Sequence, residues 1–528
     1  MSAEPSTVCI LAAGRGTRAA IHGDWLHKAL LPLGSQPVVS HIIGQFPSDT
    51  RFVVACGHLS GQLKGFLSLA HPQTQIEYVD VDPFEGPGSG PGRSLLCCRP
   101  NLPGPFVFTA CDTLIGGKLP RMDGNWLGVM PVDDPSSWCT LGTDKDGLVT
   151  DIAYKRANGH RLAFVGLGYV HDIEAFWEAL AARVPNARGE LQVDPGLEAM
   201  AARGCRIEPV DWTDTGTVEN YLEALSRLGP TMSFEGKSND LTFQVGDQII
   251  KLFRSESTAL SRYERGLAHP DCFAAVTERH GQLFGTRRVE GALLADVATP
   301  DHDTRFLSWM QRAFWRDHDT PVDTFRRQMS AFYGEKTRTR LRQFLDDRAW
   351  GREPACILAG NVPIPTVDEV LSTSEGHWLH GGWPSSFHGD LHDENVLVTE
   401  DGHFVLIDWR EDFAGDPATG DRYYDLAKYY HTLDLSVATM RDRDYAIEET
   451  ATGLEIRHKD TPILSERRRA FWRFVDDHGY DRRRIAFLNG LIFVNMAPLY
   501  KDPMSSYLYF LGRKRLSEAV FREPGDDV

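Results

Sequence analysis

A short stretch in the C-terminal half places polar side chains at a restrictive spacing. His388, Asp390 and Asn395 form the pattern His-x-Asp-x-x-x-x-Asn, and Asp408 follows directly after the apolar run Val405–Ile407. An aspartate that accepts a proton, followed by an asparagine and a second aspartate that bind Mg²⁺, is the arrangement of kinase catalytic loops. A solvated acidic turn is the alternative, but it does not require this spacing. The stretch therefore predicts a protein-kinase-like fold.

The full string, HGDxHxxN followed by IDW, resembles the aminoglycoside phosphotransferase and choline kinase-like family of small-molecule kinases. The resemblance implies that Asp390 accepts the proton of a substrate hydroxyl group. It also implies that Asn395 and Asp408 hold Mg²⁺ on the phosphates of ATP. Asp425 would steady the loop, and His388 would be structural.

The nucleotide-binding end of this kinase is expected just before residue 255. The segment 241–253 is predicted to be a hairpin that turns at Gly246-Asp247. By the same resemblance, Lys237 and Ser238 lie in a phosphate-covering loop, Lys251 binds the α- and β-phosphates, and Glu264 pairs with Lys251. The alternatives are an ordinary strand lysine and an ordinary exposed helix glutamate.

Arg410 departs from the family pattern. Amino-alcohol and aminoglycoside kinases often carry an acidic residue after the Asp-Trp pair, whereas this chain has Arg410. We interpret Arg410 as a substrate-binding residue that disfavours a cationic substrate; pairing with a neighbouring acid is the alternative. The aromatic residues of Ile485–Ser517 are expected mainly in a helical core, and otherwise around the acceptor.

The N-terminal half has a different pattern, in which short apolar runs alternate with amphipathic segments. Helices are expected at Val38–Gln45, Ile173–Arg183 and Val218–Leu228, and strands at Val8–Ala12, Phe52–Ala55, Ile76–Val79, Phe106–Thr109 and Trp126–Pro131. Such alternation predicts an open, mostly parallel Rossmann-like α/β sheet. It ends at Gly229-Pro230. We therefore predict domains at 1–228 and 229–528, the latter an α+β kinase with a β-rich lobe at about 231–300 and a helical lobe at 301–528.

The first predicted strand runs into a glycine-rich turn, Leu11-Ala-Ala-Gly-Arg-Gly-Thr-Arg18. Backbone N–H groups in such a turn suit phosphates, and Lys28 adds a cation ten residues later. A plain strand-to-helix turn is the alternative. A buried strand that ends in Asp112 supplies a carboxylate.

Together these segments resemble the sugar-phosphate nucleotidyltransferase family, including phosphocholine-type members. The family's proline before the lysine is His27 here. The segment Gly86–Ser94 stands where the family recognises the nucleobase, but its sequence is atypical, so the identity of the base stays open. The resemblance implies catalytic roles for Arg18 and Lys28 and Mg²⁺ ligation by Asp112 and Asp214. It implies nucleotide binding by Leu11, Ala13, Gly14, Arg15, Gly16, Gly88 and Ser89, and substrate binding by Lys155, Gly166 and Glu190.

The two predicted activities fit in series. The C-terminal half would phosphorylate a small alcohol with ATP. The N-terminal half would then transfer a nucleotidyl group, expected to come from CTP though another NTP stays open, and release pyrophosphate. A CDP-activated amino alcohol or polyol for surface polysaccharide is the first hypothesis. A sugar kinase joined to a sugar-1-phosphate nucleotidyltransferase is the second, and a degenerate half that only binds ligands is the third.

The composition narrows the class of partner and the compartment. A net charge of −17 disfavours general nucleic-acid binding, which needs a basic surface. Nine cysteines without a Cys-x-x-Cys pair are typical of reduced thiols. No apolar run is long enough for a membrane span, and Val8–Ala13 is too short for a signal peptide core. We therefore expect a cytoplasmic enzyme, with homo-oligomerisation open.

Overall fold

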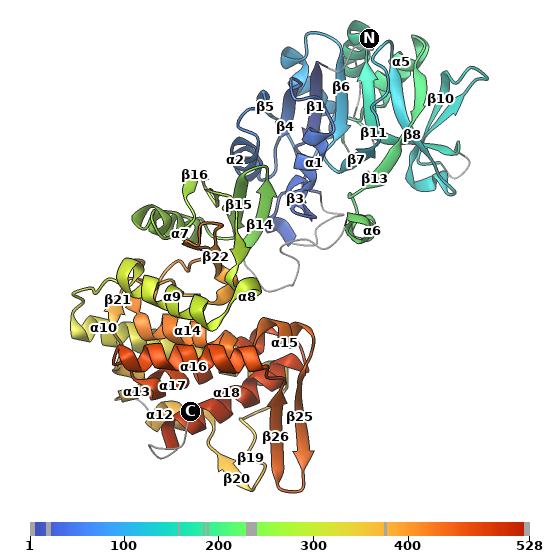
Figure 1. Cartoon of the computed structure of the whole chain (residues 1–528). Helices are drawn as coiled ribbons and strands as arrows, with labels where there is room; N and C mark the ends of the chain where they lie inside the picture. Colours follow the sequence, from blue (N-terminus) through green and yellow to red (C-terminus); the bar gives the residue numbers. More distant parts are fainter. Residues whose placement is uncertain are drawn as a thin grey trace. The chain divides into compact units, whose positions relative to one another are not determined.

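The structure is a computed structural model of the chain, and it describes residues 6–16, 23–156, 159–182, 185–186, 189–228, 240–373 and 377–521. The chain forms two compact units (Figure 1). Unit 1 comprises Met1–Glu256 and Thr277–Thr286, and unit 2 comprises Ser257–Val276 and Arg287–Val528. In the described residues, no helix combines the length and apolar character that crossing a bilayer requires.

Unit 1 contains a nine-stranded mixed sheet with the order β10-β9-β11-β6-β1-β4-β5; β8 also pairs with β11, and β12 pairs with β8. Its strands are β1 (Thr7–Ala12), β4 (Arg51–Cys56), β5 (Ile76–Asp80), β6 (Phe106–Ala110), β8 (Trp126–Pro131), β9 (Cys139–Thr143), β10 (Val149–Tyr154), β11 (Leu162–Val170) and β12 (Arg206–Pro209). β1 pairs in parallel with β4 and β6, whereas β11 is antiparallel to β6, β8 and β9. The Rossmann-like α/β fold is confirmed, with an antiparallel part added to the parallel one.

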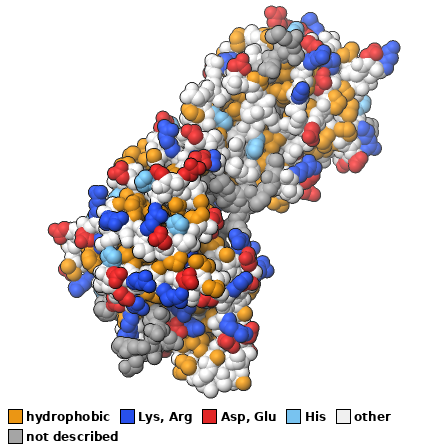
Figure 2. Space-filling view, in the orientation of Figure 1, with side chains coloured by type: hydrophobic (Ala, Val, Ile, Leu, Met, Phe, Trp, Pro, Cys, Tyr) orange, Lys and Arg blue, Asp and Glu red, His pale blue; other side chains and the backbone are white. Residues whose placement is uncertain are grey.

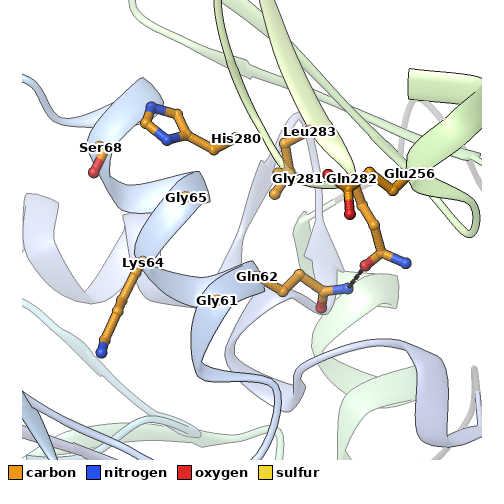
Figure 3. A pocket seen from close by; sticks show the side chains of 10 residues that line it. All are labelled: Gly61, Gln62, Lys64, Gly65, Ser68, Glu256, His280, Gly281, Gln282 and Leu283. Carbon is orange, nitrogen blue, oxygen red and sulfur yellow. Dashed lines mark hydrogen bonds between the residues drawn. The ribbon is translucent and has the colours of Figure 1, made fainter. Parts of the chain in front are cut away.

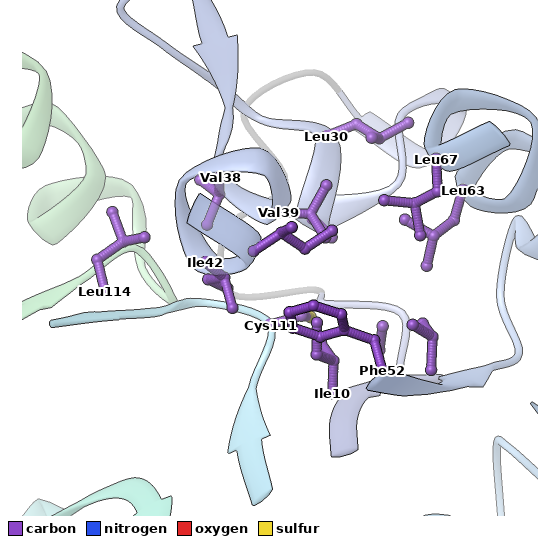
Figure 4. Close-up of a cluster of buried hydrophobic side chains, with 14 of the residues drawn as sticks. Ile10, Leu30, Val38, Val39, Ile42, Phe52, Leu63, Leu67, Cys111 and Leu114 are labelled. Atoms are coloured by element: carbon purple, nitrogen blue, oxygen red, sulfur yellow. The ribbon is translucent and has the colours of Figure 1, made fainter. Parts of the chain in front are cut away.

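The sheet of unit 1 is buried on both faces, which explains its continuous apolar strands. Val8 and Ile10 of β1 face one apolar cluster and Cys9 faces another. Figure 4 shows the first cluster, in which side chains of α1 and α2 lie over Ile10 and Phe52. The helices are α1 (Val38–Gly44), α2 (Ser60–Ala70), α3 (Pro91–Cys98), α4 (Ile173–Ala181), α5 (Asp194–Ala202) and α6 (Val218–Leu228).

Unit 1 also includes a small four-stranded sheet, β14-β15-β17-β16. Its strands are β14 (Asp240–Val245), β15 (Gln248–Phe253), β16 (Val276–His280) and β17 (Leu283–Arg287). Phe243 packs edge-on against Phe66 of α2, with ring centroids 5.3 Å apart. The Gln62 amide donates to the side-chain oxygen of Gln282 at 3.3 Å, beside a cavity of about 460 Å³ (Figure 3). The small sheet therefore shares a core with the α/β sheet.

The predicted domain boundary at 228/229 stays a prediction, because residues 229–239 lie outside the described part of the chain. The hairpin expected at 241–253 is present as β14 and β15. Lys237 and Ser238 also lie outside the described residues.

Unit 2 is largely helical, as the sequence predicts. Its helices are α7 (Glu256–Ala268), α8 (Leu294–Val297), α9 (Pro300–Trp309), α10 (Val322–Met329), α11 (Lys336–Asp347), α12 (Val367–Thr373), α13 (His377–His380), α14 (Arg422–Asp434), α15 (Val437–Arg441), α16 (Pro462–Asp477), α17 (Arg482–Met496) and α18 (Met504–Phe521). Its strands include β18 (Ala292–Leu293), β22 (Val396–Val398) and β23 (Phe404–Leu406) in one sheet, and β19 (Cys356–Leu358), β20 (Val362–Ile364), β25 (Tyr445–Thr450) and β26 (Gly453–His458) in another. Phe487, Phe493, Tyr507 and Tyr509 are buried in α17 and α18, as expected for a core.

Candidate active sites

The first candidate site begins where β1 ends. The loop after β1 carries Gly14, Arg15 and Gly16, and Gly16 has a φ of +66°, in the left-handed region that favours glycine. A Cβ atom at Gly16 would lie 2.5 Å from Cδ of Lys28, so only glycine lets the loop pass over the lysine stem. Arg15 pairs with Glu85 at 2.9 Å. Arg18 lies outside the described residues.

Lys28 is held at the site by its buried neighbour, His27. The Ala29 N–H donates to Nδ1 of His27 at 3.1 Å, which leaves Nε2 to donate to the Ala12 carbonyl at 3.0 Å. Burial lowers the pKa of His27 to about 3, so the ring is neutral. His27 is a positioning residue that the sequence reasoning missed, although its place in the family pattern, where a proline is usual, was a signal.

Lys28 forms an ion pair with one of the two predicted metal aspartates. Its Nζ lies 3.2 Å from Oδ2 of Asp112, which follows β6. Burial opposes the charge on Lys28, but the Asp112 carboxylate outweighs it and raises the pKa of the lysine. The backbone carbonyl of Asp112 accepts bonds from both the N–H and the hydroxyl group of Thr215, at 3.0 and 3.1 Å. This contact brings Asp214 to the same place.

Asp112 and Asp214 enclose a space that a side chain would fill. β13 (Asp211–Asp214) pairs antiparallel with β7 (Thr113–Gly116), and both aspartates lie at that end of the pair. A Cβ atom at Gly216 would lie 3.0 Å from Oδ1 of Asp214 and 3.2 Å from Oδ2 of Asp112. Mg²⁺ is usually bound by one or two carboxylates together with substrate phosphates. The donor set therefore fits Mg²⁺, although the described residues contain no group of three or more potential ligands.

Gly166 and Lys155, two of the predicted substrate-binding residues, differ in how they are placed relative to the two aspartates. Gly166, at a bulge of β11 with a φ of +82°, faces Ala110 and Thr113, which flank Asp112 closely. Lys155 is exposed after β10, and its backbone N–H donates to the carbonyl of Trp138 at 2.8 Å. Gly166 thus lies beside the residues on either side of Asp112, whereas among the described residues the Lys155 side chain contacts the ring of Tyr154.

The structure joins the predicted base-recognition loop to the segment of Glu190. The Gly88 N–H donates to the Gly189 carbonyl, and the Leu191 N–H donates to the Ser89 carbonyl, both at 2.6 Å. Two segments about a hundred residues apart in the sequence therefore form one edge. Gln192 donates to the Glu190 carboxylate at 2.8 Å and fixes its direction.

The second candidate site surrounds Asp390 in unit 2. Oδ1 of Asp390 lies 2.7 Å from Nζ of Lys428, on α14. Partial burial raises the pKa of Asp390, but the Lys428 charge overrides it and holds that pKa well below its usual range. The Asn395 amide donates to the Asp390 carbonyl at 2.9 Å, which couples the two predicted functional residues.

Asp425 fixes the backbone of the catalytic loop. Its carboxylate accepts the N–H groups of His388 and Gly389, at 2.7 and 2.8 Å, and the indole N–H of Trp315, at 3.0 Å. Burial raises the pKa of Asp425 to about 6, against the effect of these donors. His388 accepts from the Asp390 N–H at 3.2 Å and contacts the Ile407 carbonyl at 2.9 Å. The loop is therefore fixed from α14 and from the strand that precedes Asp408.

Substitution of Asp425 by asparagine is expected to weaken the kinase site selectively. An asparagine side chain has one acceptor oxygen, so at least one of the three donors would lose its partner. A buried unsatisfied donor costs about 1–3 kcal/mol. We expect a lower melting temperature and a loss of phosphorylation, with nucleotidyl transfer unchanged. Calorimetry and both enzyme assays check this, and unchanged kinase activity would contradict the role of Asp425.

The segment after Asp408 is packed against α7. Asp408 has a φ of +59°, a sparsely populated conformation that concentrates at functional sites. Trp409 stacks on Phe273, with centroids 4.3 Å apart, and donates to the carbonyl of Arg262 at 2.7 Å. The guanidinium of Arg265 donates to the carbonyls of both Phe387 and Arg410. Arg265 is a second positioning residue that the sequence reasoning missed.

The predicted Lys251–Glu264 pair stays a prediction. Lys251 is buried on β15 of unit 1, opposite Thr242 of β14. Glu264 is exposed on α7, in the part of that helix that belongs to unit 2.

Comparison with known proteins supports both halves. The family described as "MobA-like NTP transferase domain" matches residues 8–118, and the "Phosphotransferase enzyme family" matches residues 258–456. The chain is 28% identical over 233 residues to bifunctional protein GlmU of Kineococcus radiotolerans, covering 40% of this chain and 45% of that protein. It is 19% identical over 254 residues to GlmU of Methanococcus aeolicus, covering 46% of this chain and 57% of that protein.

The chain spans about half the length of these curated relatives. A solved structure of UDP-glucose pyrophosphorylase complexed with UDP-glucose matches 42% of this chain and 98% of its own, at 18% identity and a TM-score of 0.37. The two family matches alone show that the chain carries a MobA-like NTP transferase domain in its N-terminal part and a phosphotransferase-family domain in its C-terminal part.

Proposed function

We propose that the chain is a bifunctional enzyme in which the C-terminal half phosphorylates a small hydroxyl compound and the N-terminal half activates the product with a nucleotide. The observation that carries the proposal is that each unit holds, beside a lysine, a carboxylate that is assigned to its reaction. In unit 1, Asp112 lies beside Lys28. In unit 2, Asp390 lies beside Lys428.

In the kinase step, the hydroxyl oxygen of the acceptor attacks the γ-phosphorus of ATP, and ADP leaves. Asp390 accepts the hydroxyl proton, and Lys428 keeps that carboxylate ionised beforehand. Asn395 and Asp408 would hold Mg²⁺, which screens the phosphate charge when bound. Asp425 and Arg265 fix the loop.

In the nucleotidyl step, a phosphate oxygen of the product attacks the α-phosphorus of the NTP, and pyrophosphate leaves. Asp112 and Asp214 would hold Mg²⁺, which lowers the repulsion between the two anions when bound. Lys28, and Arg18 as the sequence predicts, bind the triphosphate. The loop from Leu11 through Ala13 to Gly16 offers backbone donors to it.

The finer assignments belong to the same proposal. CTP is the proposed nucleotide of the N-terminal site, Gly88 and Ser89 would contact its base, and Lys155, Gly166 and Glu190 would bind the phosphorylated acceptor. The proposed product is a CDP-activated precursor for surface polysaccharide, made in the cytoplasm. The nine free cysteines support that compartment.

A two-part screen tests the proposal on the full chain. Pyrophosphate release is measured for four NTPs with a panel of phosphorylated alcohols and sugar 1-phosphates, and ADP release is measured with the unphosphorylated forms. We expect CTP with a phosphorylated alcohol to give the highest rate. Turnover confined to sugar 1-phosphates would favour the sugar-activating alternative, and the absence of either release would contradict the corresponding half.

A further inference from the structure

Four basic side chains of unit 2 lie close enough to affect one another's charge, and we call them the cation cluster: Lys336, Arg340, Arg410 and Lys428. Lys428 joins the cluster to the Asp390 carboxylate. Lys336 and Arg340 lie on α11, after the π-helical turn η7 (Ser330–Glu335). Lys428 lies on α14, and Arg410 follows Trp409. On the face drawn in Figure 2, by contrast, basic and acidic side chains are interspersed.

Two side chains of this cluster contact the same aromatic ring. Nζ of Lys336 lies 4.1 Å from the ring centroid of Phe332, and the guanidinium carbon of Arg410 lies 5.2 Å from the same centroid. Tyr424 packs edge-on against Phe332, with centroids 4.9 Å apart. Two cations on one ring repel each other, and cation–π contacts of about 0.5–2 kcal/mol do not replace a carboxylate partner.

Arg410 lies directly against the catalytic loop. A Cβ atom at Gly389 would lie 2.6 Å from Cβ of Arg410, and the Arg410 N–H donates to the His388 carbonyl at 2.9 Å. Gly389 immediately precedes Asp390. The cation cluster is therefore adjacent to the residue that would accept the proton of the acceptor.

The acids around the cluster do not neutralise it. Oε1 of Glu411 lies 3.8 Å from Nε of Arg410, but the same carboxylate binds Arg262 at 3.0 Å. Asp390 already forms an ion pair with Lys428. Within the described ranges, Lys336 makes no ion pair, and burial together with the charges of Arg410, Arg340 and Lys428 lowers its pKa well below the usual value. Partly buried like charges are costly, and either the loss of a proton or a bound anion relieves that cost.

We propose that the hydroxyl compound phosphorylated at Asp390 carries an anionic group, a carboxylate or a phosphate, and that Lys336, Arg340 and Arg410 bind this group. The inference rests on the proposed kinase activity and narrows its substrate class. The bond formed joins the acceptor oxygen to the γ-phosphorus, the bond broken frees ADP, and the proton passes to Asp390. An amino alcohol would meet repulsion at the cluster, because its cation would enter a positive field.

The phosphates of ATP are the other anions that could meet this cluster. Lys336 and Arg340 lie on α11, whereas the proposed metal ligands Asn395 and Asp408 lie at the two ends of the β22–β23 hairpin. Separate Michaelis constants for ATP and for the acceptor distinguish the two occupants.

The test is a charge series on the full chain. ADP release is measured with glycerate and glycerol 3-phosphate as anions, glycerol as the neutral analogue, and ethanolamine and choline as cations. We expect kcat/KM at least tenfold higher for an anionic acceptor than for glycerol, and the two anions separate carboxylate from phosphate recognition. Equal or better turnover of glycerol or a cation would overturn the inference while leaving the kinase intact. ADP release with none of the five would count against the kinase proposal itself.

A variant pair then assigns the effect to the cluster. Lys336→Gln should raise the KM of the anionic acceptor about 10- to 100-fold, the factor expected for one charge-assisted hydrogen bond, with a smaller change in kcat. Lys336→Arg should restore most of the loss. Arg342→Gln, an exposed position on the same helix, is the matched control. A rise confined to the KM of ATP would show that the cluster binds the nucleotide and would contradict the inference.

Discussion

The Asp390→Asn variant is expected to lose ATP-dependent phosphorylation by about 10²- to 10⁴-fold, the usual contribution of a positioned proton acceptor. Asparagine keeps the shape of the side chain but cannot take the hydroxyl proton. It also removes the carboxylate that lies 2.7 Å from the Lys428 ammonium group. The loss should appear in kcat, because the proton moves during the chemical step. ADP release at saturating acceptor measures it.

Three controls separate chemistry from folding in this experiment. Pyrophosphate release from supplied phosphorylated acceptor should be unchanged, because that site belongs to unit 1. Asp401→Asn, an exposed acid in the turn after β22, should leave both activities intact. ATP binding, measured by calorimetry, should persist in Asp390→Asn. Retention of more than about a tenth of the kinase rate would remove Asp390 from the role of proton acceptor.

The second large effect is expected from Asp112→Asn. This substitution removes one of two carboxylates that flank Gly216 and the counter-charge of Lys28. Charge stabilisation by a bound metal is worth several kcal/mol, so nucleotidyl transfer should fall by roughly 1000-fold or more. The Mg²⁺ concentration for half-maximal activity should rise as well. Pyrophosphate release across an Mg²⁺ titration measures both.

The matched control for this variant lies on the strand of the second aspartate. Asp211→Asn changes an exposed acid at the other end of β13 and should leave nucleotidyl transfer and its Mg²⁺ dependence unchanged. Kinase activity should be intact in both variants. An Asp112→Asn enzyme with an unaltered Mg²⁺ requirement would exclude this aspartate as a metal ligand.

The sequence predicts well those features that short-range patterns determine. β8 and α6 have the predicted bounds, because apolar periodicity and a following turn or Gly-Pro define them. Asp390 and Asn395 could be found together because only four residues separate them in one loop. Asp112 and Asp214 could be assigned to one site only through the family resemblance. The pairing of β7 with β13 brings them together although they lie about a hundred positions apart in the sequence.

Other parts of the sites depend on tertiary contacts that no local pattern records. His27 replaces the proline usual in the family, but its role depends on the Ala12 carbonyl of a different element. Lys336 is one basic residue in a basic helix until Phe332 and Arg410 are seen around it. The mixed sheet follows from long-range strand order, which apolar periodicity does not encode.

The small sheet β14-β15-β17-β16 bears on how such a gene can change over evolution. Leu241, Phe243, Ile250, Leu252 and Leu283 from this sheet are buried in the same apolar cluster as Val8 and Ile10. The chain enters unit 2 at Ser257, returns to unit 1 at Thr277 and leaves again at Arg287. No single break in the gene divides it into the two compact units. Exchange of one unit by recombination at a single site would therefore also divide the other unit, so the two units are expected to be inherited together.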